Sequence, residues 1–223
     1  MLDTISKEIK QLITNYHSED KIIFKNKILN VSSDNFQQIN PSKENDNSTN
    51  SITFIDGGQA EIINAGNFCL SFIKVGAVRF KNNKKEGFIK NEFYLLTYAK
   101  NYNHDLYYFS KIFPLNNNPK LVQEDLLTIS SNDKTIKDGI NRAPIQKIIN
   151  MARRFSELNL AKKLSQQNYS DHFLLDGTLE PIFNGEENII KNLPKNVSAL
   201  AKSSSLLTEN GNNPNTIFSK IGP

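Results

Sequence analysis

Residues 144–178 read PIQKIINMARRFSELNLAKKLSQQNYSDHFLLDGT and join two kinds of hydrophobic pattern. From residue 145 to about 166, apolar residues recur at three- and four-residue steps, which predicts one long helix. Pro144 suits the first turn of that helix. Residues 172–175 then form a short apolar run of strand character, which ends at Asp176. A long helix followed closely by a strand is typical of an α/β fold.

Upstream of this helix, several runs are rich in β-branched and aromatic residues, and polar clusters that predict turns separate them. These strand candidates lie at residues 52–55, 60–80, 93–98 and 106–109. Downstream, we expect residues 182–200 to form one or two further helical pieces, interrupted at Pro194. The order of strands, long helix, strand and helices predicts an α/β fold with a ribonuclease-H-like mixed sheet and flanking helices.

The N-terminal region is expected to be separate from this pattern. The chain has 223 residues, a length that suits one domain better than two. Residues 2–16 have apolar side chains at helical spacing and predict an amphipathic helix. Residues 41–50, PSKENDNSTN, have the composition of a linker or surface loop. We therefore expect residues 1–50 to form an N-terminal helix and polar linker, and residues 51–223 to form the main domain.

Composition limits the kinds of site that the chain can contain. Cys69 is the only cysteine beside three histidines, which rules out an internal disulfide and argues against a thiolate zinc site. Any bound metal is therefore expected to have oxygen ligands. The net charge of +4 favours a polyanionic partner only weakly. No apolar run approaches the roughly 20 residues of a membrane helix. Because the N-terminus also lacks a secretory-signal pattern, we expect a cytoplasmic location and no membrane association.

Two aspartates directly follow apolar strand candidates, Asp56 after Phe54-Ile55 and Asp176 after Leu174-Leu175. An aspartate at the end of a strand has its backbone fixed by the sheet, while its side chain emerges where the next loop opens. Such carboxylates can hold Mg²⁺ or Mn²⁺, ions that prefer oxygen ligands. Because a glycine follows each aspartate, a hairpin turn is the alternative interpretation, and the sequence leaves both open.

A third carboxylate, Glu157, lies within the predicted helix, and its neighbours at helical spacing are apolar. A carboxylate on the core-facing side of a helix is costly unless it is neutral, paired or bound to a metal. Its partner is either a metal ion or Arg153, one turn earlier in the helix. If a metal is shared, we expect Asp56, Glu157 and Asp176 to lie within about 6 Å of one another at one edge of the sheet.

Taken together, the segments FIDGG at 54–58, RRFSEL at 153–158 and LLDGTL at 174–179 resemble the NurA family of DNA-end nucleases. This resemblance extends over roughly residues 50–210. It implies a ribonuclease-H-like fold, a homodimer, and Mn²⁺-dependent (or Mg²⁺-dependent) single-strand endonuclease and 5′-to-3′ exonuclease activity on DNA. It also implies a partner, a HerA-type hexameric ATPase, with which such nucleases resect double-strand breaks.

By the same resemblance, Asp56, Glu157 and Asp176 would be the catalytic metal ligands. The segment AKSSSLL at 201–207 is also similar to the family, so Lys202 would meet a phosphate of the DNA, with a solvated surface lysine as the alternative. The family supplies a tyrosine and a histidine from later strands, whereas the last histidine here is His172. At roughly 13 Å along the strand from Asp176, His172 is not expected to replace the missing one.

We therefore expect a nuclease domain that is C-terminally incomplete. The main alternative function is a catalytically weak or inactive NurA-like interaction module that dimerises and binds the ATPase. A further alternative is an unrelated α/β domain in which the two Asp-Gly turns are accidental.

Overall fold

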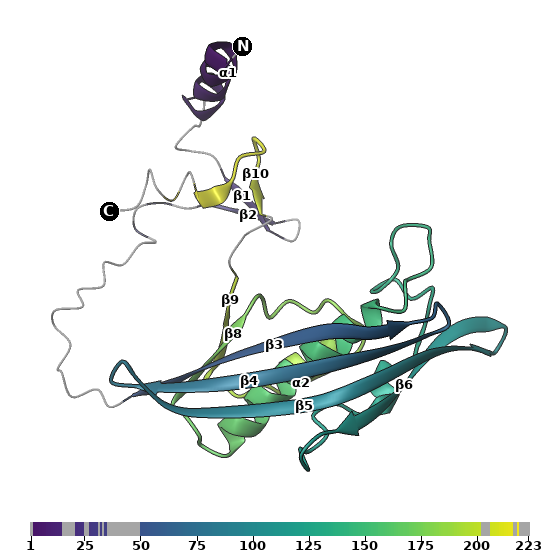
Figure 1. Cartoon of the computed structure of the whole chain (residues 1–223). Helices are drawn as coiled ribbons and strands as arrows, with labels where there is room; N and C mark the ends of the chain where they lie inside the picture. Colours follow the sequence, from purple (N-terminus) through teal and green to yellow (C-terminus); the bar gives the residue numbers. More distant parts are fainter. Residues whose placement is uncertain are drawn as a thin grey trace. The chain divides into compact units, whose positions relative to one another are not determined.

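The computed structural model describes residues 2–14, 21–24, 27–30, 32, 34, 50–201, 206–215 and 218 (Figure 1). The chain divides into two compact units. One unit spans Thr49–Ala201, and the other is made of Met1–Ser48 together with Lys202–Pro223. Among the described residues, no helix is both long and apolar enough to span a membrane.

The smaller unit contains helix α1, Leu2–Thr14, and a three-stranded antiparallel sheet in the order β10-β1-β2. These strands are β1 (Ile22–Phe24), β2 (Lys27–Leu29) and β10 (Leu207–Thr208). The helix predicted at residues 2–16 is confirmed as far as Thr14, while residues 15 and 16 lie outside the described part of the chain. Residues 41–49 of the predicted linker also lie outside it. The three short strands were not predicted.

The larger unit is an α/β structure built on a mixed sheet of seven strands in the order β7-β6-β5-β4-β3-β8-β9. Four long strands form an antiparallel meander on one side: β3 (Ser51–Asn64), β4 (Phe68–Lys81), β5 (Lys84–Tyr102) and β6 (Asp105–Pro114). The short strand β7, Ile129–Ser130, extends that side next to β6. On the other side of β3, β8 (His172–Asp176) and β9 (Val197–Leu200) add in parallel. The predicted α/β class is therefore confirmed.

Helix α2, Lys147–Gln166, connects the meander to β8 and crosses one face of the sheet (Figure 1). It ends at Gln166, as the sequence predicted. It contacts β3, β4 and β8 of the sheet, and it also contacts α3 (Glu186–Lys191) and the 3-10 helix η3 (Glu124–Leu127). Most of its residues are buried, because the helix is packed on more than one side.

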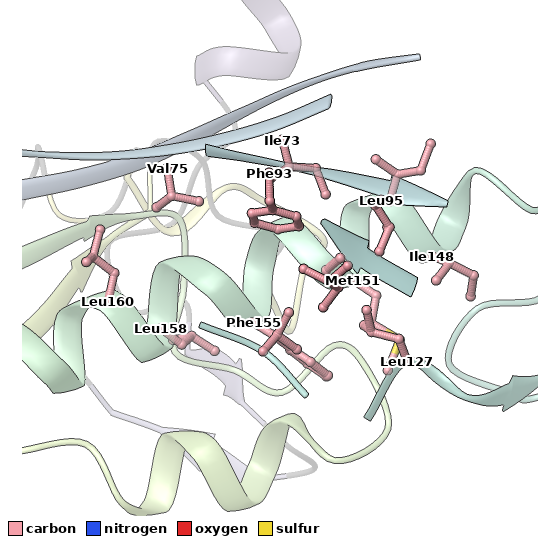
Figure 2. Packing of buried hydrophobic residues seen from close by; sticks show 14 of the residues in the cluster. Ile73, Val75, Phe93, Leu95, Leu127, Ile148, Met151, Phe155, Leu158 and Leu160 are labelled. Atoms are coloured by element: carbon pink, nitrogen blue, oxygen red, sulfur yellow. The ribbon is translucent and has the colours of Figure 1, made fainter. Parts of the chain in front are cut away.

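The hydrophobic core lies between α2 and the sheet. Strand alternation points every second side chain of β4 and β5 toward the helix. Figure 2 shows where these side chains meet: Ile73, Val75, Phe93 and Leu95 come from the strands, and Ile148, Met151, Phe155, Leu158 and Leu160 come from α2. Leu127 of η3 joins the same cluster.

Two expectations about strand boundaries were wrong. The strand that begins before Asp56 does not end there, because Asp56 is paired with Gly76 and β3 continues to Asn64. Residues 182–200 are not all helical, since Val197–Leu200 forms strand β9 instead. Both errors have the same cause: pairing with another strand, β4 for the first and β8 for the second, extends or creates the strand, and the local residue pattern does not show that pairing.

Phe155 is fully buried, and its ring packs edge-on against Phe183 with ring centroids 6.3 Å apart. Phe155→Ala should therefore lower the free energy of unfolding by about 3–5 kcal/mol, because it removes the ring and leaves a cavity. Phe113→Ala, at a side chain that is 48% exposed, is the matched control and should cost far less. Urea unfolding followed by circular dichroism measures both, and equal losses for the two variants would contradict this placement of the core.

Candidate functional site

Asp56 and Asp176 lie side by side on two neighbouring parallel strands. Ile55 of β3 and Leu175 of β8 are register partners, and each aspartate is the next residue along its strand. Strands in a sheet are roughly 5 Å apart, so the two aspartates begin from neighbouring backbone positions. Both side chains are exposed. Asp176 ends β8 as predicted, and Asp56 accepts a hydrogen bond of 2.8 Å from the backbone N–H of Gly57.

Neither aspartate belongs to a hairpin turn. Asp56 is inside a strand, and the chain after Asp176 returns through α3 to the parallel strand β9. The alternative interpretation of the two Asp-Gly pairs is therefore wrong at both positions.

The two aspartates share the face of the sheet that is opposite α2, which we call the open face. Along β3, Thr53 and Ile55 are buried toward the helix, whereas Phe54 and Asp56 are exposed on the other side. The same alternation in β8 buries Phe173 and Leu175 and exposes Asp176. The aspartate pair is thus accessible on the open face.

Glu157 approaches the same region from α2, on the covered face of the sheet. Its carboxylate accepts a hydrogen bond of 2.9 Å from Nη1 of Arg153, and the same nitrogen donates to the carbonyl oxygen of Gly57 at 3.0 Å. Glu157 is 5% exposed, so this partner satisfies a carboxylate that water hardly reaches. The ion pair with Arg153, one of the two partners that the sequence allowed, is therefore present.

The glycine after Asp56 makes this approach possible. A methyl group at Gly57 would lie 2.5 Å from Oε1 of Glu157 and 2.9 Å from Cγ of Arg153. Any side chain at this position would therefore displace the side chains of Glu157 and Arg153, which lie between α2 and β3. The neighbouring Gly58 has no atom within 4 Å of the corresponding position.

Burial raises the pKa of Glu157 from 4.5 to about 7. Arg153 and Arg154 act in the opposite direction, while the negative charge of Asp56 contributes to the increase. The side chain of Arg153 is 33% exposed, so water screens part of its charge, and the attraction does not offset the loss of hydration at Glu157.

A divalent cation needs several oxygen ligands that converge on one point. Asp56 and Asp176 fit this requirement in part, since they are exposed neighbours on one face. Glu157 does not complete the set, because it is held by Arg153 on the covered face. Within the part of the chain that the structure describes, no three His, Cys, Asp or Glu residues form a group able to hold a metal ion. The expected triad is thus a pair of aspartates beside a separately bonded glutamate.

A buried ion pair that sequence analysis missed supports the segment after Asp176. Nε of Arg154 donates to Glu186 at 2.8 Å, and Nη2 of Arg154 donates to the carbonyl oxygen of Thr178. Glu186 also accepts hydrogen bonds from the backbone N–H groups of Ile182 and Phe183, at 2.8 and 3.0 Å. This network joins α2, the loop after β8 and the start of α3. The available signal was weak, because the neighbours of Arg154 at helical spacing are the apolar Met151 and Leu158 but also Asn150 and Glu157.

The remaining predicted positions add little to the site. Lys202 lies outside the described residues. His172 begins β8, as predicted, at the end of the strand opposite to Asp176.

In comparisons with known proteins, no family model matches the chain, and no curated protein or solved structure is significantly similar to it. The resemblance to NurA nucleases therefore rests on the sequence segments alone.

The contact of Gly57 with α2 can be tested with a pair of adjacent substitutions. Gly57→Ala should lower the free energy of unfolding by about 1–3 kcal/mol, because the buried Glu157 and Arg153 have to move. Gly58→Ala meets open space and should change it little or raise it by up to about 1 kcal/mol. Chemical denaturation compares the two variants. If Gly57→Ala is as stable as Gly58→Ala, α2 does not approach β3 as described.

The raised pKa of Glu157 makes stability depend on pH. The folded state binds a proton more tightly than the unfolded state, so this group destabilises the fold progressively as pH rises from 4.5 to about 7. Glu157→Gln should therefore raise the free energy of unfolding at pH 8.5, by up to about 3 kcal/mol, and change it little at pH 5. The measurement is urea unfolding at both pH values with a chelator present.

Glu187→Gln is the control for this pH dependence, because Glu187 is exposed on α3. Its replacement should leave the free energy of unfolding almost unchanged at both pH values. A Glu157→Gln variant that is less stable than wild type at pH 8.5 would show that the Arg153 ion pair outweighs the effect of burial.

Proposed function

We propose that the chain is a metal-dependent DNA nuclease with a ribonuclease-H-like sheet. The observation that carries this proposal is the position of Asp56 and Asp176, at matched levels on the neighbouring parallel strands β3 and β8, with Glu157 on the helix that connects the meander to β8. These are the three residues that the resemblance to NurA nucleases assigns as catalytic.

The strand order supports the finer assignment of the fold. In a ribonuclease-H-like sheet, three antiparallel strands are followed by a helix and then by two strands added in parallel beside the first. The segment β5-β4-β3-β8-β9 has this order and these directions, with α2 and α3 as the connecting helices. Strands β6 and β7 extend the antiparallel side.

The open face supports a nucleic-acid substrate. Aromatic rings pair across its strands, and single-stranded DNA binds such surfaces by base stacking. The pairs are Phe54 with Phe80, Phe72 with Tyr94, and Tyr98 with Phe109, with ring centroids 5.8, 5.7 and 5.9 Å apart. The pair of Phe54 and Phe80 is the one beside the site, because Phe54 lies two residues before Asp56 on β3, so a strand stacked there would pass close to the aspartates.

In this proposal Asp56 and Asp176 would hold Mn²⁺ or Mg²⁺, and a bound ion would supply activation of water and stabilisation of the leaving oxygen of the phosphodiester. Arg153 holds Glu157 on the covered face, so Glu157 joins the site only if it leaves that partner. The network of Arg154 and Glu186 anchors the loop after β8 and with it the end of the strand that carries Asp176. End resection with a HerA-type ATPase and a homodimeric state belong to the same proposal.

A direct test is cleavage of end-labelled single-stranded DNA by the purified chain with Mn²⁺. Asp56→Asn and Asp176→Asn should each reduce the cleavage rate by more than roughly 100-fold. Loss of a residue that only orients a metal ligand typically costs roughly 10- to 100-fold, and these two residues are proposed as the ligands themselves. Asp125→Asn, at an exposed carboxylate on η3, is the control and should leave the rate unchanged. Both site variants should keep the melting temperature of the wild type within a few degrees.

A second candidate function has one observation in its favour. Because the described residues contain no converged group of three ligands, a catalytically inactive module that dimerises and binds a HerA-type ATPase also accounts for the arrangement. This candidate predicts that the wild type releases no more product than the Asp56→Asn variant, yet co-elutes with the ATPase. Mn²⁺-dependent cleavage that both aspartate variants abolish would exclude it.

A further inference from the structure

A cleft of about 380 Å³ lies beside the C-terminal half of α2, at some distance along the helix from Glu157. Three lysines line it: Lys162 and Lys163 project from α2, and Lys120 comes from the segment before η3. No lining residue is acidic among those that the structure describes. The cleft is therefore a shallow, open hollow lined by positive charge.

The two helix lysines lack a neutralising partner inside the larger unit. Lys120 pairs with Glu124 at 2.8 Å, but the described residues give neither Lys162 nor Lys163 an ion pair. Both residues are half-buried. Lysines near a helix C-terminus are favoured by the helix dipole, which accounts for their place in the sequence. The dipole does not account for the absence of acidic residues, among those described, from the wall that the two lysines line.

The remaining walls are of two kinds. Carboxamides are contributed by Gln123, Asn159 and Gln166, and apolar surface by Leu121, Leu126 and Ile189. Carboxamide side chains offer a donor and an acceptor together, the combination that pairs with the edge of a nucleobase. Aliphatic side chains suit the flat face of the same base. Positive charge in this cleft matches the phosphate of a nucleotide, and the carboxamides and apolar surface match the edge and the face of its base.

The volume of the cleft limits the size of the ligand that it can bind. Ligand pockets hold about 300–1,000 Å³, and this one is near the lower limit. A smaller hollow of about 150 Å³ adjoins it and shares Lys163 and Leu121. We propose that this cleft binds a mononucleotide, with its phosphate on Lys162 and Lys163 and its base against the carboxamides and the apolar wall. The proposal does not depend on nuclease activity at Asp56 and Asp176.

Isothermal titration of the full chain with deoxyadenosine monophosphate tests the proposal. We expect saturable one-to-one binding with a Kd below about 1 mM, and binding of deoxyadenosine that is at least roughly tenfold weaker, because it lacks the phosphate. Lys162→Gln and Lys163→Gln should each weaken binding of the nucleotide by roughly tenfold while leaving the melting temperature unchanged. Lys100→Gln, at an exposed lysine of β5, is the matched control and should bind as the wild type does.

Three outcomes would overturn the proposal. The first is no saturable binding of deoxyadenosine monophosphate, including the case in which only a long single-stranded oligonucleotide binds. The second is equal affinity for the nucleotide and for deoxyadenosine. The third is a loss in Lys100→Gln as large as that in Lys162→Gln and Lys163→Gln, which would identify the effect as one of net charge.

Discussion

The parallel pairing of β3 with β8 is the interaction on which the rest of the larger unit depends. A parallel neighbour cannot be reached by a short turn, so the chain has to cross the sheet, and α2 is that crossing. The crossing buries α2 against β3 and β4 and creates the core. The register of the same pairing sets Asp56 beside Asp176, one residue after Ile55 and Leu175. Fold and candidate site therefore follow from one contact between strands that are far apart in the sequence.

Elements with a strong local pattern could be predicted from the sequence, and elements set by pairing with another strand could not. The periodicity of α2 predicted its end at Gln166, and the apolar run at residues 172–175 predicted β8. By contrast, β5 spans Lys84–Tyr102, whereas its sequence suggested only residues 93–98 as strand. Val197–Leu200 has a weak strand pattern of its own and is a strand because β8 lies beside it. The same limit applied to Asp56, whose strand continues because β4 pairs with it.

The candidate site was predictable in its residue types and only in part in its geometry. Asp56 and Asp176 were predicted because each follows an apolar strand candidate and precedes a glycine. A partner for Glu157 was predicted because an unpaired buried carboxylate is costly. Which partner Glu157 takes depends on the distance between α2 and β3, and the missing side chain of Gly57 permits a close approach. The result is a buried carboxylate near a negatively charged neighbour, with a raised pKa and an arginine partner. Such an arrangement costs stability, which is common where residues are positioned for function.

The central claim is that the neighbouring aspartates of β3 and β8 form the core of a divalent cation site. An anomalous difference map from crystals of the chain grown with Mn²⁺ tests it most directly, because the map locates the ion independently of activity. The account predicts a peak between the carboxylates of Asp56 and Asp176 on the open face of the sheet. A map with both side chains well ordered and no peak beside them, at a saturating concentration of Mn²⁺, would contradict it.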